Sequence, residues 1–424
     1  MAHRPIRHLR WYIAGLLFLA TVINYVDRQG FSILAPDLQA EIGWSELDYS
    51  RMVIAFQLSY ATVMMVSGRV FDIIGTRLGF AISIVLWSLS EIGHAFARTP
   101  FGFGTARFFL GLSEAGNFPG AIKAVAEWFP ARERALATGI FNSGVGVGAV
   151  IAPIVVPLLA AAYGWQATFV VTGVFGLLWL PVWLWLYHDR VRHPRLSAEE
   201  RTLIESGQES TPAVKVPWTS LLRIRQTWTY ALSKSLADPI WWFYLFWLPK
   251  FLAASYGLRS TAIIPYLTVV YVAADLGCLA GGWLSSAFVR RGWSVNAARK
   301  GTLALLAAIM TPSVIAAGLL NDPWIVVLLI SLACGCHQAW STIIFTTASD
   351  LFPQEAVGSV AGLGGFVAGM VSIVTAEVTG RVLNQDPTMY LPIFLAAGAL
   401  YPIGLLVLHL MSPRFERAKL AAAD

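Results

Sequence analysis

The first long apolar segment of the chain, Trp11 to Pro36, reads WYIAGLLFLATVINYVDRQGFSILAP. It is long enough to cross a bilayer as a helix, since about 20 residues span the hydrocarbon core. Within it, Asp27 and Arg28 place a carboxylate and a guanidinium among apolar residues, at a cost of at least about 2.5–3.5 kcal/mol each. We therefore interpret this span as functional: Arg28 binds an anion and Asp27 helps to move a proton.

Composition indicates a membrane protein. The 424 residues are 57% hydrophobic and 13% charged, whereas soluble domains carry roughly 25% charged residues. The net charge of +6 is spread over short loops, so we expect no nucleic-acid partner. The expected partners are the lipid bilayer and a small-molecule organic anion.

No motif of an enzyme is found. The sequence contains no phosphate-binding loop, no dinucleotide fingerprint, no HExxH and no Cys/His ligand spacing, so we expect neither a metal nor a cofactor. The three cysteines lie inside apolar segments and are interpreted as small packing residues. Without a nucleotide site, the expected driving force is an ion gradient.

About 20 apolar residues are needed to cross the hydrocarbon core as a helix, and this criterion predicts twelve transmembrane helices. The long polar stretch 189–226 separates six spans from six, which predicts a six-helix bundle in residues 1–188, a cytoplasmic linker, and a second six-helix bundle in residues 227–424. The predicted class is an all-α membrane protein. The predicted spans are residues 11–36, 50–73, 78–97, 101–123, 135–161, 166–187, 228–254, 262–288, 301–320, 324–348, 356–382 and 389–411.

Lysine and arginine predict the orientation, because cytoplasmic loops carry an excess of both. With the N-terminus inside, the inside loops contain Arg77, Arg134, the linker and the basic stretch 290–300, whereas the first outside loop is acidic. We therefore expect both termini in the cytoplasm.

The loop between the second and third spans reads GRVFDIIGTR from Gly68 to Arg77. Its glycines allow close helix approach and a tight turn, and Asp72 and Arg77 can pair with the backbone or with each other. We interpret Gly68, Asp72, Gly75 and Arg77 as gating residues. A weaker copy of this motif, residues 281–292, follows six spans later and lacks the aspartate. Such a repeat is expected when the two halves of the chain have the same fold in parallel orientation.

Charges inside the spans are few. In the fourth span Arg107 and Glu114 are seven residues apart and so share a helix face. At about 1.5 Å per residue, Asp27 lies between them in depth, so the three can form one network beside Arg28. We interpret this network as a proton-coupling switch, in which protonating a carboxylate releases an arginine for the substrate. The alternative is a permanent buried salt bridge that only locks the spans together.

Other polar and aromatic groups in the spans are candidates for substrate contacts. Tyr60 can donate its hydroxyl, although a packing role is open for this tyrosine as for Tyr25. Trp241 either stacks on a sugar ring or faces lipid, and Lys234 can pair with Asp238 four residues on. The candidate substrate-binding residues are Arg28, Tyr25, Tyr60, Asn142, Lys234, Trp241, His337, Gln338 and Trp340.

These motifs together resemble the major facilitator superfamily and, within it, the bacterial hexuronate transporters of the anion:cation symporter family. The loop from Gly68 to Arg77 is similar to the superfamily signature G-x-x-x-D-x-x-G-x-R, and the resemblance covers nearly the whole chain. The other blocks that carry it are Leu9–Tyr12, Asn24–Gln29, Ala106-Arg107 with Glu114-Ala115, Glu127–Pro130 with Arg132–Arg134, Asp238–Lys250 and His337–Ser341.

The resemblance implies a proton-coupled importer of galacturonate or glucuronate in the bacterial inner membrane, working by alternating access. It implies that Arg28 contacts the substrate carboxylate, and that Tyr25 and Tyr60 lie near the substrate. It also implies that Asp27 and Glu114 are proton sites linked by Arg107. The proton is then a co-substrate, no cofactor is needed, and a monomer is the superfamily's default.

Two departures keep alternatives open. The acid at Asp27 is not present in every hexuronate-type relative, so Glu114 is the safer proton site. Asn142 stands where some sugar-acid relatives use a glutamine, which leaves the sugar selectivity open. A proton symporter of another organic anion (an aldonate, an aldarate or an aromatic acid) and a transporter-like sugar-acid sensor are the alternative functions.

Overall fold

Helices account for the regular structure in the part of the chain that the computed structural model describes, residues 5–188, 193–206, 218–352 and 354–418. These residues form no strand beyond an isolated bridge between Ile6 and Leu196. The expected all-α class is confirmed. The elements are α1 (Leu9–Ile42), α2 (Glu46–Ile74), α3 (Thr76–His94), α4 (Pro100–Glu114), α5 (Asn117–Trp128), α6 (Ala131–Leu186), α7 (Ala198–Ser206), α8 (Trp218–Leu221), α9 (Arg225–Tyr256), η2 (Ser260–Ile263), α10 (Ile264–Arg290), α11 (Val295–Leu319), α12 (Pro323–Leu351), α13 (Gln354–Gln385) and α14 (Leu391–Met411).

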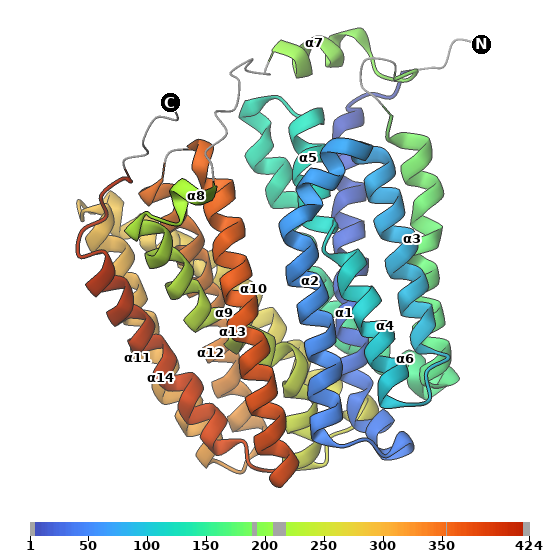
Figure 1. The fold of residues 1–424 in the computed structure, drawn as a ribbon, viewed down its shortest axis with the longest axis vertical. Coiled ribbons are helices and arrows are strands. Elements are labelled where there is room, and N and C mark those ends of the chain that lie inside the picture. Colours follow the sequence, from blue (N-terminus) through green and yellow to red (C-terminus); the bar gives the residue numbers. More distant parts are fainter. Residues whose placement is uncertain (1–4, 189–192, 207–217, 353, 419–424) are drawn as a thin grey trace.

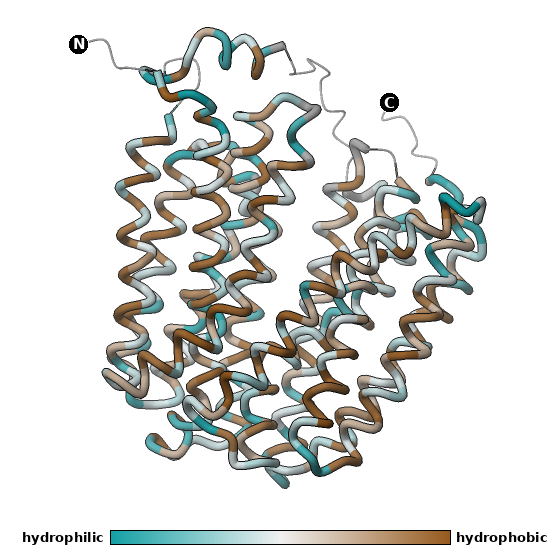
Figure 2. Tube along the Cα trace, turned by 180° about the vertical axis from the view of Figure 1, so that it is seen from behind, coloured by the Kyte–Doolittle hydropathy of each residue, from teal (hydrophilic) through white to brown (hydrophobic). Residues whose placement is uncertain are grey.

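Each of the twelve predicted spans falls largely on helix, with differences of a few residues at some ends. α1, α2 and α3 contain one span each, α4 with α5 the fourth, α6 the fifth and sixth, and α9 to α14 the other six. Among the described residues, seven segments are long and apolar enough to cross a membrane by length and composition alone, and one of them, residues 136–186, contains two spans. The remaining spans, in α2, α3, α4 with α5, and α9, are shorter or more polar. Figure 2 shows hydrophobic residues along the helices and hydrophilic ones concentrated near the loops at both ends.

Two bundles stand side by side in Figure 1, one built from α1–α6 and the other from α9–α14. The start of α1, the end of α14 and helix α7 lie at the same end of the molecule, which we call the terminal end; the opposite end is the far end. The predicted boundaries, with residues 189–226 as a linker, stay a prediction. Residues 189–192 and 207–217 of that linker lie outside the described part of the chain.

The predicted fourth span is not one continuous helix. α4 ends at Glu114 and α5 starts at Asn117, with a short turn between them. Pro119 explains the break, because its ring nitrogen has no N–H to donate to the carbonyl of Ala115. The break leaves Glu114 as the last residue of α4, buried inside the bundle.

Glycines with positive φ mark corresponding turns in the two halves. Gly75, between α2 and α3, has φ 80°, and Gly292, between α10 and α11, has φ 91°. Side chains are disfavoured at such φ values, so glycine is the default residue at both turns. The predicted weaker copy of the motif therefore occupies the corresponding turn of the second bundle. A third such residue, Gly164 (φ 84°, ψ 163°), separates the two spans within α6.

The two bundles are joined by polar contacts toward the far end. Tyr49 of α2 donates its hydroxyl to the carbonyl of Phe246 in α9 at 2.6 Å, and Ser50 donates to a carbonyl of α13 at 2.7 Å. Lys250 of α9 forms an ion pair with Glu46 of α2 at 2.7 Å. From there the helices of the two bundles diverge toward the terminal end (Figure 1). These contacts close the far end.

Helix α7 is fixed to the start of α1. Glu200 of α7 accepts hydrogen bonds from the backbone N–H groups of Leu9 and Arg10 at 3.0 and 3.2 Å, and pairs with the Arg10 guanidinium at 2.6 Å. Arg10 also pairs with Glu133 near the start of α6 at 2.8 Å. A carboxylate is favourable here because the first N–H groups of a helix have no partner within it. The described part of the linker thus contacts the N-terminal bundle.

Candidate substrate and proton site

Arg28 lies at the centre of a buried cluster in the N-terminal bundle. Its Nε donates to Oε2 of Glu114 at 2.9 Å, and its Nη2 donates to Oδ1 of Asn24, one turn earlier on α1, at 3.0 Å. The side chains of Arg28 and Glu114 are only 3% and 0% exposed. Removing one charge of such a pair leaves the other unpaired in a medium of low dielectric, which is strongly unfavourable. Glu114 is therefore the counter-ion of Arg28 in this structure.

Four aromatic rings surround the guanidinium of Arg28. Its Cζ lies 4.7 Å from the ring centre of Tyr25, 4.8 Å from Tyr60, 5.5 Å from Phe56 and 5.8 Å from Trp242. All four distances are within the range of about 6 Å for cation–π attraction. Trp242 belongs to α9, so the C-terminal bundle completes this enclosure. Nη1 of Arg28 takes part in neither of the two hydrogen bonds described above, so it can serve a further acceptor.

Asp27, one of the predicted proton sites, is fully buried, and neither of its carboxylate oxygens has a hydrogen-bond partner among the described residues. The nearby Glu114 carries a charge of the same sign. A buried and unpaired carboxylate is costly, and its neutral acid form is much less so. This geometry therefore favours a proton on Asp27.

The pairing differs from the expected one at Arg107. The predicted network had Arg107 linking Asp27 to Glu114, but its Nη1 donates to the backbone carbonyl of Arg28 at 3.3 Å, and Nε and Nη2 have no partner among the described residues. Its guanidinium lies 4.3 Å from the ring of Phe56. Glu114, two turns beyond Arg107 on α4, pairs with the side chain of Arg28 instead. Arg107 interacts with Glu114 electrostatically, without an ion-pair contact.

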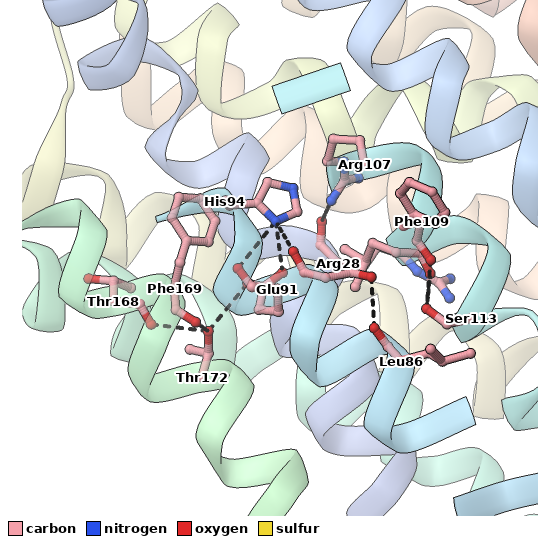
Figure 3. Close-up of polar contacts among 12 residues, drawn as sticks. Arg28, Leu86, Glu91, His94, Arg107, Phe109, Ser113, Thr168, Phe169 and Thr172 are labelled. Atoms are coloured by element: carbon pink, nitrogen blue, oxygen red, sulfur yellow. Dashed lines mark hydrogen bonds and ion pairs between the residues drawn. The ribbon is translucent and has the colours of Figure 1, made fainter. Parts of the chain in front are cut away.

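Sequence reasoning missed two titratable side chains of α3, Glu91 and His94. Both are buried, at 1% and 0% exposure, and Figure 3 shows them beside Arg107 and Thr172. The sequence contained the signal, because an acidic residue inside a predicted span has a high free energy of membrane insertion and therefore indicates function. Glu91 lies within span 78–97 and satisfies that criterion as Asp27 does.

A second polar group lies in the C-terminal bundle around His337. Its Nδ1 is 2.9 Å from the Tyr401 hydroxyl, and its ring stacks on Trp241 with centres 5.9 Å apart and 6° between the planes. Trp340 packs edge to face on Tyr401 at 5.5 Å. Tyr401 was not predicted, because a tyrosine in an apolar span is usually a packing residue.

The aromatic and charged residues of span seven lie inside the molecule. Trp242 packs on Tyr60 of the other bundle, with ring centres 6.2 Å apart, and Trp241 packs on His337. These contacts favour the cavity-facing alternative over the lipid-facing one. The predicted pair of Lys234 with Asp238 is present, with Nζ 2.7 Å from Oδ2.

Asn142 and Gln338 make no hydrogen bond to the described residues of the Arg28 cluster. Asn142 is exposed and Gln338 is half-buried. Asn142 lies one turn before Gly146 on α6, where an added Cβ would be 2.3 Å from the carboxylate of Asp275 in α10. That face of α6 is turned toward the other bundle, so Asn142 lies where the two bundles diverge.

The predicted gating residues make their contacts inside the N-terminal bundle. Asp72 pairs with Lys123 of α5 at 2.8 Å, and Arg77 donates to the carbonyl of Leu184 in α6. Asp72 and Arg77 do not form an ion pair with each other. The positive φ of Gly75 supplies the turn. These contacts tie α2 and α3 to α5 and α6, while the gating role of Gly68, Asp72, Gly75 and Arg77 stays a prediction.

An open groove of about 830 Å³ lies on a different part of the molecule, between α11 and α14. Its lining includes Lys300, Thr311 and His409, and none of the predicted site residues. The groove is therefore not the candidate site, which consists of the Arg28 cluster and the His337 group.

Residues 17–376 match the Major Facilitator Superfamily, so the chain belongs to this family of membrane transporters. The expected major facilitator fold is confirmed, as is the expectation of a transporter and not an enzyme. Among solved structures, the fold is similar to a bacterial homologue of the human lysosomal transporter Spinster in an inward-facing and occupied conformation. The TM-score is 0.75 at 17% identity, covering 96% of this chain and 98% of that one, and this likeness bears on the fold alone.

Two relatives are closer in sequence. The chain is 35% identical over 416 residues to the hexuronate transporter of Escherichia coli (strain K12), covering 96% of this chain and 94% of that protein. It is 36% identical over 344 residues to the galacturonate transporter of Dickeya chrysanthemi, covering 80% of this chain and 97% of that protein. The resemblance to hexuronate transporters that the motifs indicated is confirmed.

Proposed function

We propose that the protein is a proton-coupled symporter that imports the hexuronates galacturonate and glucuronate by alternating access. The observation that carries the proposal is the buried pair of Arg28 and Glu114, enclosed by aromatic rings of both bundles. The names of the relatives support the choice of a hexuronate as substrate.

Protonation of Glu114 is the coupling step in this proposal. A neutral Glu114 no longer balances the charge of Arg28, and the substrate carboxylate takes its place. A hexuronate carries a single carboxylate, so a single arginine neutralises it. Import against an inside-negative potential requires at least one co-transported proton, and each proton that moves with the potential contributes about 2.3 kcal/mol per 100 mV.

The sugar ring meets aromatic and polar groups from both bundles. Tyr25, Tyr60 and Trp242 already surround Arg28 and present ring faces suited to a sugar. Across from them, the His337 group and Lys234 supply hydrogen-bonding side chains of the C-terminal bundle. Asn142 and Gln338 reach the substrate only in another conformation of the cycle.

The proposed location is the bacterial inner membrane, with the protein a monomer and both termini in the cytoplasm. The basis is the excess of lysine and arginine in loops at the terminal end. In this orientation the closed far end faces the periplasm, and the structure corresponds to an inward-facing state. Gly68, Asp72, Gly75 and Arg77, at the α2–α3 junction, then lie at the cytoplasmic gate.

Uptake of labelled galacturonate and glucuronate into proteoliposomes tests the proposal. We expect accumulation under an inward proton gradient and its collapse when a protonophore is added. Neutral galactose should not compete, whereas an aldonate or aldarate competes if the anion is recognised broadly. Binding without gradient-driven accumulation would indicate a sensor or a uniporter and would contradict proton symport.

A further inference from the structure

Glu91 is held inside the N-terminal bundle by α3 and α6 (Figure 3). Its Oε1 accepts a hydrogen bond from the Thr172 hydroxyl of α6 at 3.3 Å, while Oε2 is buried and has no hydrogen-bond partner among the described residues. The Nδ1 of His94, one turn away, lies 3.7 Å from Oε2. That nitrogen faces the backbone carbonyls of Ser90 and Glu91 at 2.9 and 3.3 Å, so it is a donor and carries a hydrogen.

The carboxylate of Glu91 lies directly against α1. A Cβ atom added at Gly30 would be 3.4 Å from its Oε1, and Gly30 is one turn beyond Asp27 on the way to the far end. Glu91 is therefore next to Asp27 and closer to the far end. The charged and titratable groups that interact with it are His94 from α3, Asp27 from α1, and Arg107 and Glu114 from α4.

A charge count indicates that this cluster holds a proton. It contains the carboxyl groups of Asp27, Glu91 and Glu114 but only the guanidinium groups of Arg28 and Arg107. His94 is counted as neutral, because its Nδ1 donates to backbone carbonyls and its buried Nε2 has no acceptor among the described residues for a second hydrogen. Arg28 is paired with Glu114, so Arg107 remains to balance two acids, and it forms an ion pair with neither. A net negative charge in a fully buried cluster is unfavourable, and one proton shared by the two acids removes it.

We propose that Glu91 is a proton-carrying residue that shares this proton with Asp27, a role that rests on the proton symport proposed above. In the transfer, the O–H bond of one carboxylic acid breaks and an O–H bond forms on the other carboxylate, so the number of protons is unchanged. Because Glu91 lies toward the far end, it receives a proton that enters from that side and passes it to Asp27. Glu114, on the Arg28 side, remains the acid that competes with substrate.

Glu91→Gln in proteoliposomes tests this role. The glutamine amide keeps the shape of the side chain and the contact with Thr172, but it cannot take up and release a proton. We expect galacturonate counterflow, which needs no net proton movement, to stay within about twofold of wild type. We expect accumulation under a fixed proton gradient to fall at least tenfold, with a lower proton-to-galacturonate ratio measured from the reversal potential.

Two further variants separate proton carriage from packing. Glu91→Asp keeps a titratable acid and should recover most of the accumulation, while Glu377→Gln, in an exposed pair with Arg381, should match wild type. A wild-type coupling ratio in Glu91→Gln overturns the role, as does an equal loss of counterflow in Glu91→Gln and Glu91→Asp, which would indicate packing. If the wild type itself fails to accumulate galacturonate, the proposed function fails and the role of Glu91 fails with it.

Discussion

The guanidinium of Arg28 makes two directed hydrogen bonds at once, to Glu114 and to Asn24, beneath a set of aromatic rings. A lysine has a single compact ammonium and cannot reproduce that planar arrangement. We expect Arg28→Lys to weaken galacturonate binding by at least about tenfold, equivalent to about 1.4 kcal/mol. Calorimetric titration of the purified protein measures this directly.

A matched control is Arg381→Lys on α13, whose guanidinium is 71% exposed. It should bind galacturonate as the wild type does. A wild-type dissociation constant in Arg28→Lys would remove Arg28 from the substrate site.

At this scale the sequence identified four charged residues of the Arg28 cluster but missed Glu91, and it did not define how the four pair with one another. Asp27, Arg28, Arg107 and Glu114 were found because a charge in an apolar span is costly. The pairing of carboxylates and arginines depends on the direction of each side chain and on the relative height of the two helices. Sequence spacing within each helix defines neither. Arg28 therefore pairs with Glu114, while Arg107 lies on a backbone carbonyl.

Among the helices, α10 and α12 cross closely because glycines face each other. A Cβ atom at Gly277 would lie 2.0 Å from the carbonyl oxygen of Gly335, whereas at Gly282 the nearest atom, in the Thr342 side chain, is 3.7 Å away. Gly277→Ala should destabilise the protein by about 1–3 kcal/mol, since the helices must separate. Gly282→Ala, a neighbouring matched control, should be neutral or stabilise by up to about 1 kcal/mol.

Thermal unfolding of the two alanine variants in detergent measures the difference. Equal melting temperatures would show that the contact of α10 with α12 tolerates a side chain at Gly277.

The spans themselves were predictable because their apolar lengths repeat and the loops between them contain glycine and charge. The break in the fourth span was not predicted. Pro119 was visible in the sequence, but a proline in a membrane helix kinks it or ends it depending on the neighbouring helices.

Across the whole molecule, the ion pair of Lys250 and Glu46 joins the bundles at the closed far end. Both side chains are buried, at 4% and 8% exposure, and Gln39 also contacts Lys250. Lys250→Ala leaves the buried Glu46 carboxylate without a counter-ion and with only the hydrogen bond from Gln39, so we expect the population to shift toward a state open at the far end. Double electron–electron resonance measures this opening as a longer distance between spin labels attached at positions 96 and 321, which replace Phe96 and Asn321 in a cysteine-free background.

The charge-swapped double variant Glu46→Lys with Lys250→Glu should restore the shorter distance. An unchanged distance distribution in Lys250→Ala would show that the pair does not hold the far end closed.

In the proposed cycle, protonation of Glu114 frees Arg28 to bind the substrate carboxylate, and Glu114→Gln tests this step most directly. The variant and the wild type are compared in proteoliposomes for galacturonate counterflow and for accumulation under an inward proton gradient. Counterflow that persists while accumulation is lost is the predicted result, because the amide cannot cycle a proton. Accumulation at the wild-type level would contradict the account.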